Sequence, residues 1–253
     1  MTSCFYTRGE AAENTCVLCL CHNTSTIQHS TSPTTRIKNS GWINLKLDCK
    51  YVRLVGRDEL PKHLSPQAKL LFPRVVMLTF CTYFFLQHSS DISYQYSSNS
   101  VYKQRNLAKV LLLSLPGGYL VYVGDLAAAD SRAMDSTLLE HALATIHADN
   151  WFSKGDQVMG DSGFSGTLLP SNVDLIVPST LGSQFQLETD PANTNRAISE
   201  VRFAIEAANR GVKEFKLLSN VIDVKSITHL HQFVLLAAPL FNHWHLQNSD
   251  SQL

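Results

Sequence analysis

The sequence predicts an α/β fold in which one mixed sheet is flanked by helices. Two observations predict it. Residues 75–126 hold three apolar, strand-like runs in succession, and residues 131–245 alternate helix-like and strand-like patterns. Three strands followed by alternating helices and strands are typical of a mixed sheet with helices packed on it. With 253 residues, 44% of them hydrophobic, the chain can bury one sizeable core.

The first 40 residues are predicted to be a poorly ordered tail. They are rich in Ser, Thr, Asn and Cys and show no sustained hydrophobic period. Within the tail, the Cys-x-x-Cys-x-Cys-His pattern at 16–22 has the residue types of a zinc site. A structural zinc site normally needs two pairs of ligands, and the later His29 and Cys49 have no pair spacing. Incidental cysteines in a loose tail are the alternative.

Residues 41–74 are predicted to be a linker and a helical lead-in. Alternating apolar and polar residues at 42–55 indicate a strand, and residues 58–62 a polar connection. Ser65 and Pro66 then have the chemistry of a helix start, because Ser caps a first turn and Pro suits its first position. The remaining residues, 75–246, are predicted to form one domain.

The core of this domain is predicted to be a group of strands. Residues 75–86 are a continuous run of β-branched, aromatic and other apolar residues, typical of a strand buried on both faces. Residues 107–115 and 119–126 are predicted to be two more strands, joined by a Pro-Gly-Gly turn at 116–118.

The second half alternates helices and strands. Apolar spacing predicts a helix at 131–148, strands at 157–160 and 173–177, a loop at 184–194, and helices at 197–218 and 228–245. This order is compatible with an RNase H-like fold. In that architecture acids lie on the first strand, after the fourth strand, and on a late helix.

Charge and cysteine content bound the class of protein. The chain has 21 basic and 21 acidic residues, so composition gives no support for a generally basic nucleic-acid-binding protein. All six cysteines lie in the first third, which suits a reducing compartment better than a disulfide framework. No secretory signal is expected, because Arg8, Glu10 and Glu13 interrupt the N-terminus.

No membrane partner is expected either. The apolar stretch at 107–123 is split by the Pro-Gly-Gly turn, and the one at 227–246 contains four histidines. We therefore expect a nuclear or cytoplasmic protein that is not secreted. The sequence leaves the oligomeric state open.

Two acids are candidate ligands of a divalent cation. Asp161 follows a short strand at a Ser-Gly turn, and Glu206 lies on the long helix that comes later. Carboxylate oxygens are the ligands that hard cations prefer. Each acid alone has a simpler explanation. Asp161 suits a turn, and Glu206 could form a surface ion-pair ladder with Arg202 and Arg210.

Six short motifs occur in order between residues 60 and 242. They are Tyr-Phe-Phe-Leu-Gln-His-Ser-Ser at 83–90, Ser-Val-Tyr-Lys-x-x-Asn-Leu-x-Lys at 100–109, Pro-x-Gly-Tyr-Leu-Val at 116–121, Asp-x-x-Leu-Leu at 135–139, Gly-Asp-Ser-Gly-Phe at 160–164, and Arg-x-x-Ile-Glu at 202–206 with Lys213 after it. Together they resemble the DDE superfamily endonuclease domain of Harbinger-type and related transposases.

The resemblance implies cleavage of DNA by a site containing Mg²⁺ or Mn²⁺, with Asp161 and Glu206 as catalytic and metal-binding residues. The family's first catalytic acid lies in an Asp-Gly-Thr-Tyr motif, and the matching segment here is Phe-Cys-Thr-Tyr at 80–83. Phe80 therefore stands where the resemblance places an aspartate. Asp48, in an upstream Asp-Cys-Lys-Tyr, is a weaker substitute.

Further residues have less specific signals. Asp135 is a third candidate metal ligand, and its place before a predicted helix equally suits a cap. The candidates for contact with DNA phosphates are Lys103, Lys109, Arg202, Arg210 and Lys213. A solvated basic face is the alternative for all five.

We therefore expect a transposase-derived, DDE endonuclease-like domain that binds a divalent cation and is catalytically impaired by Phe80. DNA is the partner that the resemblance implies. The alternative is a non-catalytic DNA- or protein-binding module, retained after domestication of a transposase. A chain without function is a third reading of the same residues.

Overall fold

The computed structural model describes residues 52–101, 103–128, 134–182 and 186–250. All of them belong to one compact unit, residues 50–253. The predicted tail at 1–40, the zinc candidates at 16–22, Asp48 and most of the strand predicted at 42–55 lie outside the described residues.

The described chain forms helices, strands and short 3₁₀ helices (η). In order they are η2 (Leu60–His63), α2 (Pro66–Leu71), β1 (Val75–Phe85), α3 (Ile92–Ser98), β2 (Asn99–Ser100), β3 (Arg105–Ser114), β4 (Leu120–Ala128), α4 (Asp135–Thr145), η3 (Ala148–Asn150), β5 (Asp156–Met159), η4 (Ser162–Phe164), β6 (Val173–Ile176), α5 (Thr189–Lys213), α6 (Lys216–Ser219) and α7 (Ile227–Asp250).

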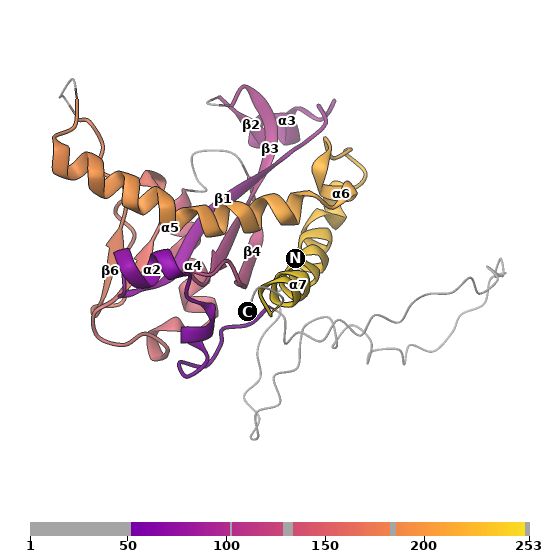
Figure 1. Cartoon of the computed structure of the whole chain (residues 1–253). Coiled ribbons are helices and arrows are strands. Elements are labelled where there is room, and N and C mark those ends of the chain that lie inside the picture. Colours follow the sequence, from indigo (N-terminus) through magenta and orange to yellow (C-terminus); the bar gives the residue numbers. More distant parts are fainter. Residues whose placement is uncertain (1–51, 102, 129–133, 183–185, 251–253) are drawn as a thin grey trace. The chain divides into compact units, whose positions relative to one another are not determined.

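The strands form one mixed sheet in the order β4-β3-β1-β5-β6, with the short β2 against the start of β3 (Figure 1). β1 runs antiparallel to β3 and parallel to β5, and β5 runs parallel to β6. The prediction of a mixed sheet flanked by helices is confirmed. β3 and β4 are antiparallel neighbours joined by a short turn, β1 reaches β3 through α3 and β2, and the parallel strands follow once helix α4 has crossed over.

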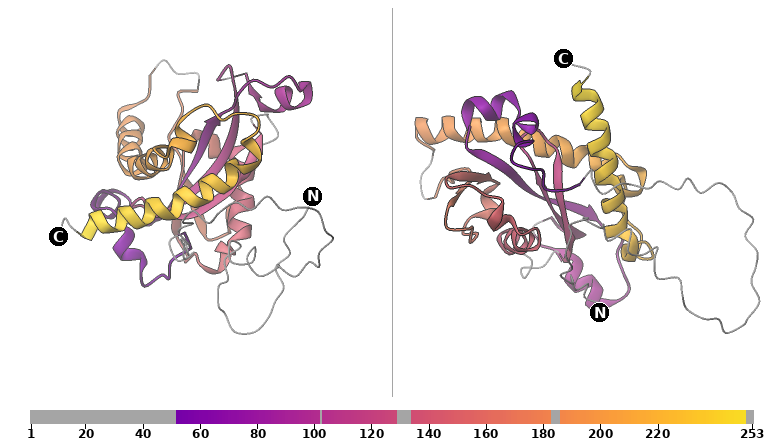
Figure 2. Two further views of the ribbon diagram at one scale, coloured as in Figure 1. Left: turned by 90° about the vertical axis from the view of Figure 1, so that its right-hand side faces the viewer. Right: turned by 90° about the horizontal axis from the view of Figure 1, so that it is seen from below.

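Helices cover both faces of the sheet (Figure 2). On one face, Leu111 of β3 packs in a cluster with Leu139 and Leu143 of α4. On the other face, Leu112 of β3 packs with Leu230 of α7. Neighbouring residues of a strand point to opposite faces, so the continuous apolar runs of β1 and β3 supply both layers of the core.

Three helical details follow the local sequence. Ser65 caps α2 as predicted, because its Oγ accepts a hydrogen bond from the N–H of Ala68 at 3.1 Å. The loop predicted at 184–194 is wrong for residues 189–194, since α5 begins at Thr189. Pro191 fits this first helical turn, where backbone N–H groups have no partner within the helix.

Two other predictions need correction. The helix predicted at 197–218 is broken after Lys213, because Phe215 has an extended backbone (φ −63°, ψ 124°) and α6 starts afresh. Residues 52–55, the described end of the strand predicted at 42–55, are not in a strand. This segment lies against the core instead, with Val55 2% exposed.

A buried asparagine ties α7 to the sheet. Asn242 is 0% exposed. Its Nδ2 donates to the carbonyl of Leu120 at 2.7 Å, and its Oδ1 accepts from the N–H of Leu120 at 2.9 Å. One side chain therefore satisfies both backbone groups at the start of β4.

Candidate active site

Asp161 lies just beyond the end of β5, where the chain turns into η4. Its Oδ1 accepts a hydrogen bond from the N–H of Gly163 at 2.9 Å, so the carboxylate caps this short helix. Asp161 therefore has the turn role that its sequence context suggested. About a third of the side chain, 36%, is exposed, which leaves the second carboxylate oxygen available to other groups.

Phe80 lies on β1, next to the segment that carries Asp161 beyond the end of β5. The last pair between β1 and β5 is Leu78 with Met159. Two residues beyond this pair stand Phe80, on β1, and Asp161, just after β5. Phe80 is partly buried and packs in a cluster with Val201 of α5.

Glu206 reaches the same region from α5. Val201 and Ile205 bury the inner face of the helix, and 48% of the Glu206 side chain remains exposed. Its carboxylate lies close to Arg202, one turn earlier, with 3.5 Å between Arg202 Nη2 and Glu206 Oε1. The same nitrogen is 4.0 Å from Asp161 Oδ2.

Arg202 is therefore the group that connects the two predicted catalytic acids. Only 12% of its side chain is exposed, so it is not part of the surface ladder considered from the sequence. Its Nε is buried and, within the described residues, has no hydrogen-bond partner. Among the same residues Glu206 has no ion pair with Arg210.

Asp135 lies across Gly163 from Asp161. It is the first residue of α4, the N-cap is Met134, and no side chain caps this helix, so the predicted capping role is wrong. Asp135 Oδ1 instead accepts a hydrogen bond from the Lys109 ammonium at 2.7 Å, with both side chains 12% exposed.

Gly163 separates Asp135 from Asp161. A Cβ at this position would stand 2.9 Å from Asp135 Oδ2 and 3.0 Å from Asp161 Oδ1. The two carboxylates thus flank one glycine, and any side chain there would push them apart.

Cys81 joins this group, and the sequence did not suggest it as a site residue. It is 2% exposed and hydrogen-bonded to Asp135. Burial, reinforced by the nearby negative charge of Asp135, raises the pKa of the thiol well above its ordinary value. Cys81 is therefore a neutral thiol that donates to a carboxylate. The alternation of β1 places it on the face opposite Phe80.

The donor set does not fit a divalent cation in this arrangement. In the parts of the chain that the structure describes, no three His, Cys, Asp or Glu side chains are grouped to hold a metal ion. Asp161 and Glu206 share Arg202, and Asp135 is paired with Lys109. A cation at the Asp161–Glu206 pair would have to compete with a guanidinium that is already in place.

The predicted phosphate-binding residues do not form one surface. Lys109 is paired with Asp135, and Lys103 shares the ring of Tyr83 with it, at 5.9 and 5.8 Å from the ring centroid. Arg202 faces the carboxylates. Arg210 is exposed on α5, and Lys213 lies at the far end of that helix over Phe84.

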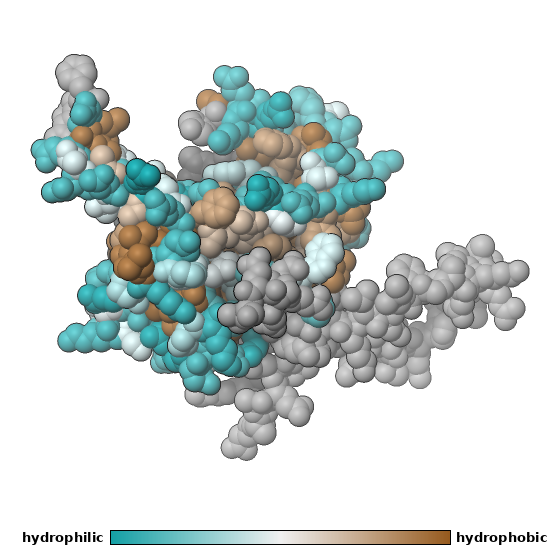
Figure 3. Space-filling view, viewed as in Figure 1, coloured by the Kyte–Doolittle hydropathy of each residue, from teal (hydrophilic) through white to brown (hydrophobic). Residues whose placement is uncertain are grey.

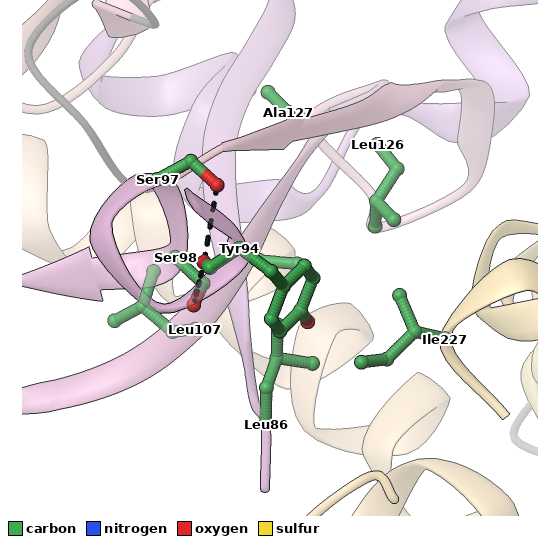
Figure 4. A pocket seen from close by; sticks show the side chains of 9 residues that line it. Leu86, Tyr94, Ser97, Ser98, Leu107, Leu126, Ala127 and Ile227 are labelled. Carbon is green, nitrogen blue, oxygen red and sulfur yellow. Dashed lines mark hydrogen bonds between the residues drawn. The ribbon is translucent and has the colours of Figure 1, made fainter. Parts of the chain in front are cut away.

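A separate apolar recess of about 110 Å³ lies under α3, at a distance in the fold from the carboxylates (Figure 4). Leu86, Leu126 and Ile227 line it together with the ring of Tyr94. The Tyr94 hydroxyl is buried there, and burial raises its pKa. Ser97 and Ser98 donate to the carbonyl of Tyr94, at 3.1 and 2.8 Å, which fixes the turn of α3 that carries this ring.

Within the described residues, no helix combines the length and the apolar character needed to cross a bilayer.

No curated protein matches the chain, and no solved structure matches it. One family model does, that of the DDE superfamily endonuclease, and it covers residues 79–242, which is well over half of the chain. The match begins at the strand that carries Phe80 and ends at Asn242. The chain therefore belongs to the DDE superfamily endonuclease family.

Proposed function

We propose that the chain is a transposase-derived, DDE endonuclease-like domain of Harbinger type whose cleavage of DNA phosphodiester bonds is impaired. The position of Phe80 carries this proposal. Phe80 stands alongside Asp161 by strand register, on the face of β1 that α5 covers. The resemblance to the family motif places the first acid at this position. A phenyl ring supplies no oxygen to a cation, so Asp161 and Glu206 are two acids of an incomplete set.

The surroundings of Arg202 support the same proposal. In a complete site, divalent cations would supply the positive charge between the carboxylates. Here one guanidinium, within 4.0 Å of both Asp161 and Glu206, supplies part of that charge. The sheet order, with acids after the fourth core strand and on a late helix, supports an RNase H-like architecture.

The test is a plasmid-nicking assay with Mg²⁺ or Mn²⁺. We expect the wild type to nick no faster than Asp161→Ala and Glu206→Ala, because the cation and the attacking water are not held. Faster nicking by the wild type, abolished by either substitution, would show a working site and refute impairment.

Phe80→Asp is the complementary variant. It restores a third carboxylate, and we expect Mn²⁺ to raise its melting temperature. At a cation concentration of about a hundred times Kd, the free energy of unfolding should rise by about 2.7 kcal/mol. Phe80→Asn is the matched control, because it places a polar side chain of the same shape there without the charge. Equal responses of the two variants to Mn²⁺ would contradict the role given to position 80.

The second candidate function is a non-catalytic DNA-binding module. The family match favours it, and so does the partly buried Lys213, which has no ion pair among the residues that the structure describes. Retention of DNA that weakens steeply with salt, in a protein that cleaves none, would support this function.

A further inference from the structure

We infer that Arg202 is a built-in counter-ion that keeps divalent cations out of the Asp161–Glu206 pair, and that it joins the end of β5 to α5 in their place. The inference rests on the proposed function in one respect, the assignment of the two acids as ancestral metal ligands. The exclusion itself is argued from the position and the burial of the guanidinium.

Arg202 is largely buried, although it lies on a helix whose surface is largely hydrophilic (Figure 3). Arg196, on the same helix, makes the comparison. Each arginine lies one turn before a glutamate, and each pair is closer than 4.0 Å. The side chain of Arg196 is 83% exposed, whereas that of Arg202 is 12% exposed. Burial and not spacing therefore distinguishes Arg202 from a surface arginine.

One nitrogen of Arg202 serves both acids. Nη2 lies 3.5 Å from Glu206 Oε1 and 4.0 Å from Asp161 Oδ2. The other oxygen of Asp161 accepts a hydrogen bond from Gly163, so the oxygen turned to the guanidinium is the one left for a ligand. In the part of the chain that the structure describes, no third carboxylate pairs with Arg202. The charge of this nearly buried group therefore depends on the two acids.

A divalent cation cannot join this arrangement without displacing the guanidinium. Hard cations bind carboxylate oxygens at about 2.0–2.6 Å, so a cation held by both acids would stand beside a group of the same sign. The guanidinium is attached to the chain and stays charged at any ordinary pH. The cation, in contrast, comes from solution and must first give up part of its water.

Position 80 decides this competition. An arginine one turn before the glutamate is part of the motif by which the chain resembles the family, so it does not exclude a metal by itself. A third carboxylate on β1 would attract a doubly charged cation more strongly than a singly charged guanidinium. Phe80 offers no such group, and the guanidinium keeps its place between two acids.

Binding of Mn²⁺ to the DNA-free protein tests the exclusion, measured by electron paramagnetic resonance of the free ion. We expect the wild type to leave this signal unchanged. Arg202→Met should bind Mn²⁺ more tightly than the wild type, by about tenfold or more, because two carboxylates then face each other without a cation. Arg202→Lys keeps the positive charge and should bind as weakly as the wild type. Adding Asp161→Asn to Arg202→Met should abolish the gain.

Thermal melts separate the exclusion from an effect on folding. In EDTA, Arg202→Met should melt at a lower temperature than the wild type, and Mn²⁺ should raise its melting temperature again, since an ion that binds only the folded state stabilises it. The wild type should melt at the same temperature with and without Mn²⁺. Arg202→Gln leaves a polar group at the site and is the second variant if Arg202→Met does not fold.

Arg196→Met is the matched control. It removes an arginine with the same spacing to a glutamate, at 3.7 Å from Glu200, but at an exposed position. We expect it to follow the wild type in both measurements. An equal gain of Mn²⁺ binding in Arg196→Met and Arg202→Met would show a general effect of charge and refute the exclusion. Equal Mn²⁺ affinity of the wild type and both Arg202 variants would refute it as well.

The nicking assay tests impairment separately, because it contains DNA. A wild type that nicks DNA but binds no Mn²⁺ by itself would refute impairment and leave the exclusion in the free protein standing. A wild type that nicks nothing but binds Mn²⁺ as tightly as Arg202→Met would refute the exclusion alone.

Discussion

The Lys109 ammonium donates a hydrogen bond to Asp135 Oδ1 at 2.7 Å, and only 12% of either side chain is exposed. This pair joins β3 to the start of α4, and Cys81 donates to the same carboxylate. Asp135 is thus held by two neighbours on the sheet, and Gly163 stands between it and Asp161.

Removal of one partner should therefore cost more than removal of both. We expect Lys109→Met to lower the free energy of unfolding by about 3 kcal/mol, because it leaves Asp135 as a nearly buried charge without its cation. The double variant Lys109→Met/Asp135→Leu should come within about 1 kcal/mol of the wild type. Urea denaturation measures both. Additive losses in the double variant would show that the two residues do not depend on each other.

Acid should destabilise the fold through His63. This side chain packs on Tyr119, with 4.6 Å between ring centroids. Burial is the largest cause of its lowered pKa; Glu59 opposes the shift and His245 adds to it. Because the unfolded chain keeps the ordinary value of 6.5, it binds more protons than the folded chain just below that pH. Neutral His63 therefore adds to the free energy of unfolding above pH 6.5, and this contribution is lost as the pH falls through the pKa of the folded state.

Thermal melts at about pH 7.5 and about pH 5.5 measure this effect. We expect His63→Gln to lose less stability than the wild type between the two conditions. His141→Gln, at an exposed position on α4, is the matched control and should follow the wild type. An unchanged pH dependence in His63→Gln would assign the acid sensitivity to another group.

Gly211 should resist replacement although it lies in a helix. Glycine to alanine in a helix normally stabilises by about 1 kcal/mol. A Cβ at 211, however, would stand 2.5 Å from two ring carbons of Phe241 on α7. Overpacking of this kind costs about 1–3 kcal/mol, so we expect Gly211→Ala to be net destabilising in denaturant unfolding.

Two further variants isolate the clash. Phe241→Leu in the Gly211→Ala background should recover part of the loss, because the shorter side chain makes room. Asn193→Ala, at an exposed position of α5, should instead stabilise by about 0.5 kcal/mol through helix propensity alone. If the Gly211→Ala variant had a higher free energy of unfolding than the wild type, α5 and α7 would be able to move apart at this contact at little cost.

Strands were easier to predict than helix ends, for a physical reason. β1, β3 and β4 are apolar on both faces because helices cover both sides of the sheet, so their sequences stand out as continuous runs. The first turns of α5 carry polar residues that face solvent, and without an apolar stripe the segment resembles a loop. The break before α6 depends on the backbone of Phe215, which no periodicity encodes.

The site was predicted in part. Asp161 and Glu206 were singled out, and the structure brings both to Arg202. Cys81 was missed because its role depends on the place where α4 begins in space, not on neighbours in the chain. Arg202 was predicted to contact phosphates, with a solvated ladder as the alternative, because spacing alone does not reveal that its guanidinium is turned toward the end of β5. Pairings between distant segments are decided by packing, which single-sequence patterns do not contain.

The hydrogen bonds of Asn242 have a consequence for the evolution of the chain. The Asn242 side-chain amide, at the C-terminal end of the matched region, forms hydrogen bonds with both backbone groups of Leu120. The first residue of β4 therefore has these partners only after α7 has been synthesised. A frameshift or stop codon ahead of α7 would leave two backbone groups of the sheet without partners and expose the apolar surface that this helix covers. Truncated copies should therefore be degraded rather than persist as inactive competitors of an intact transposase.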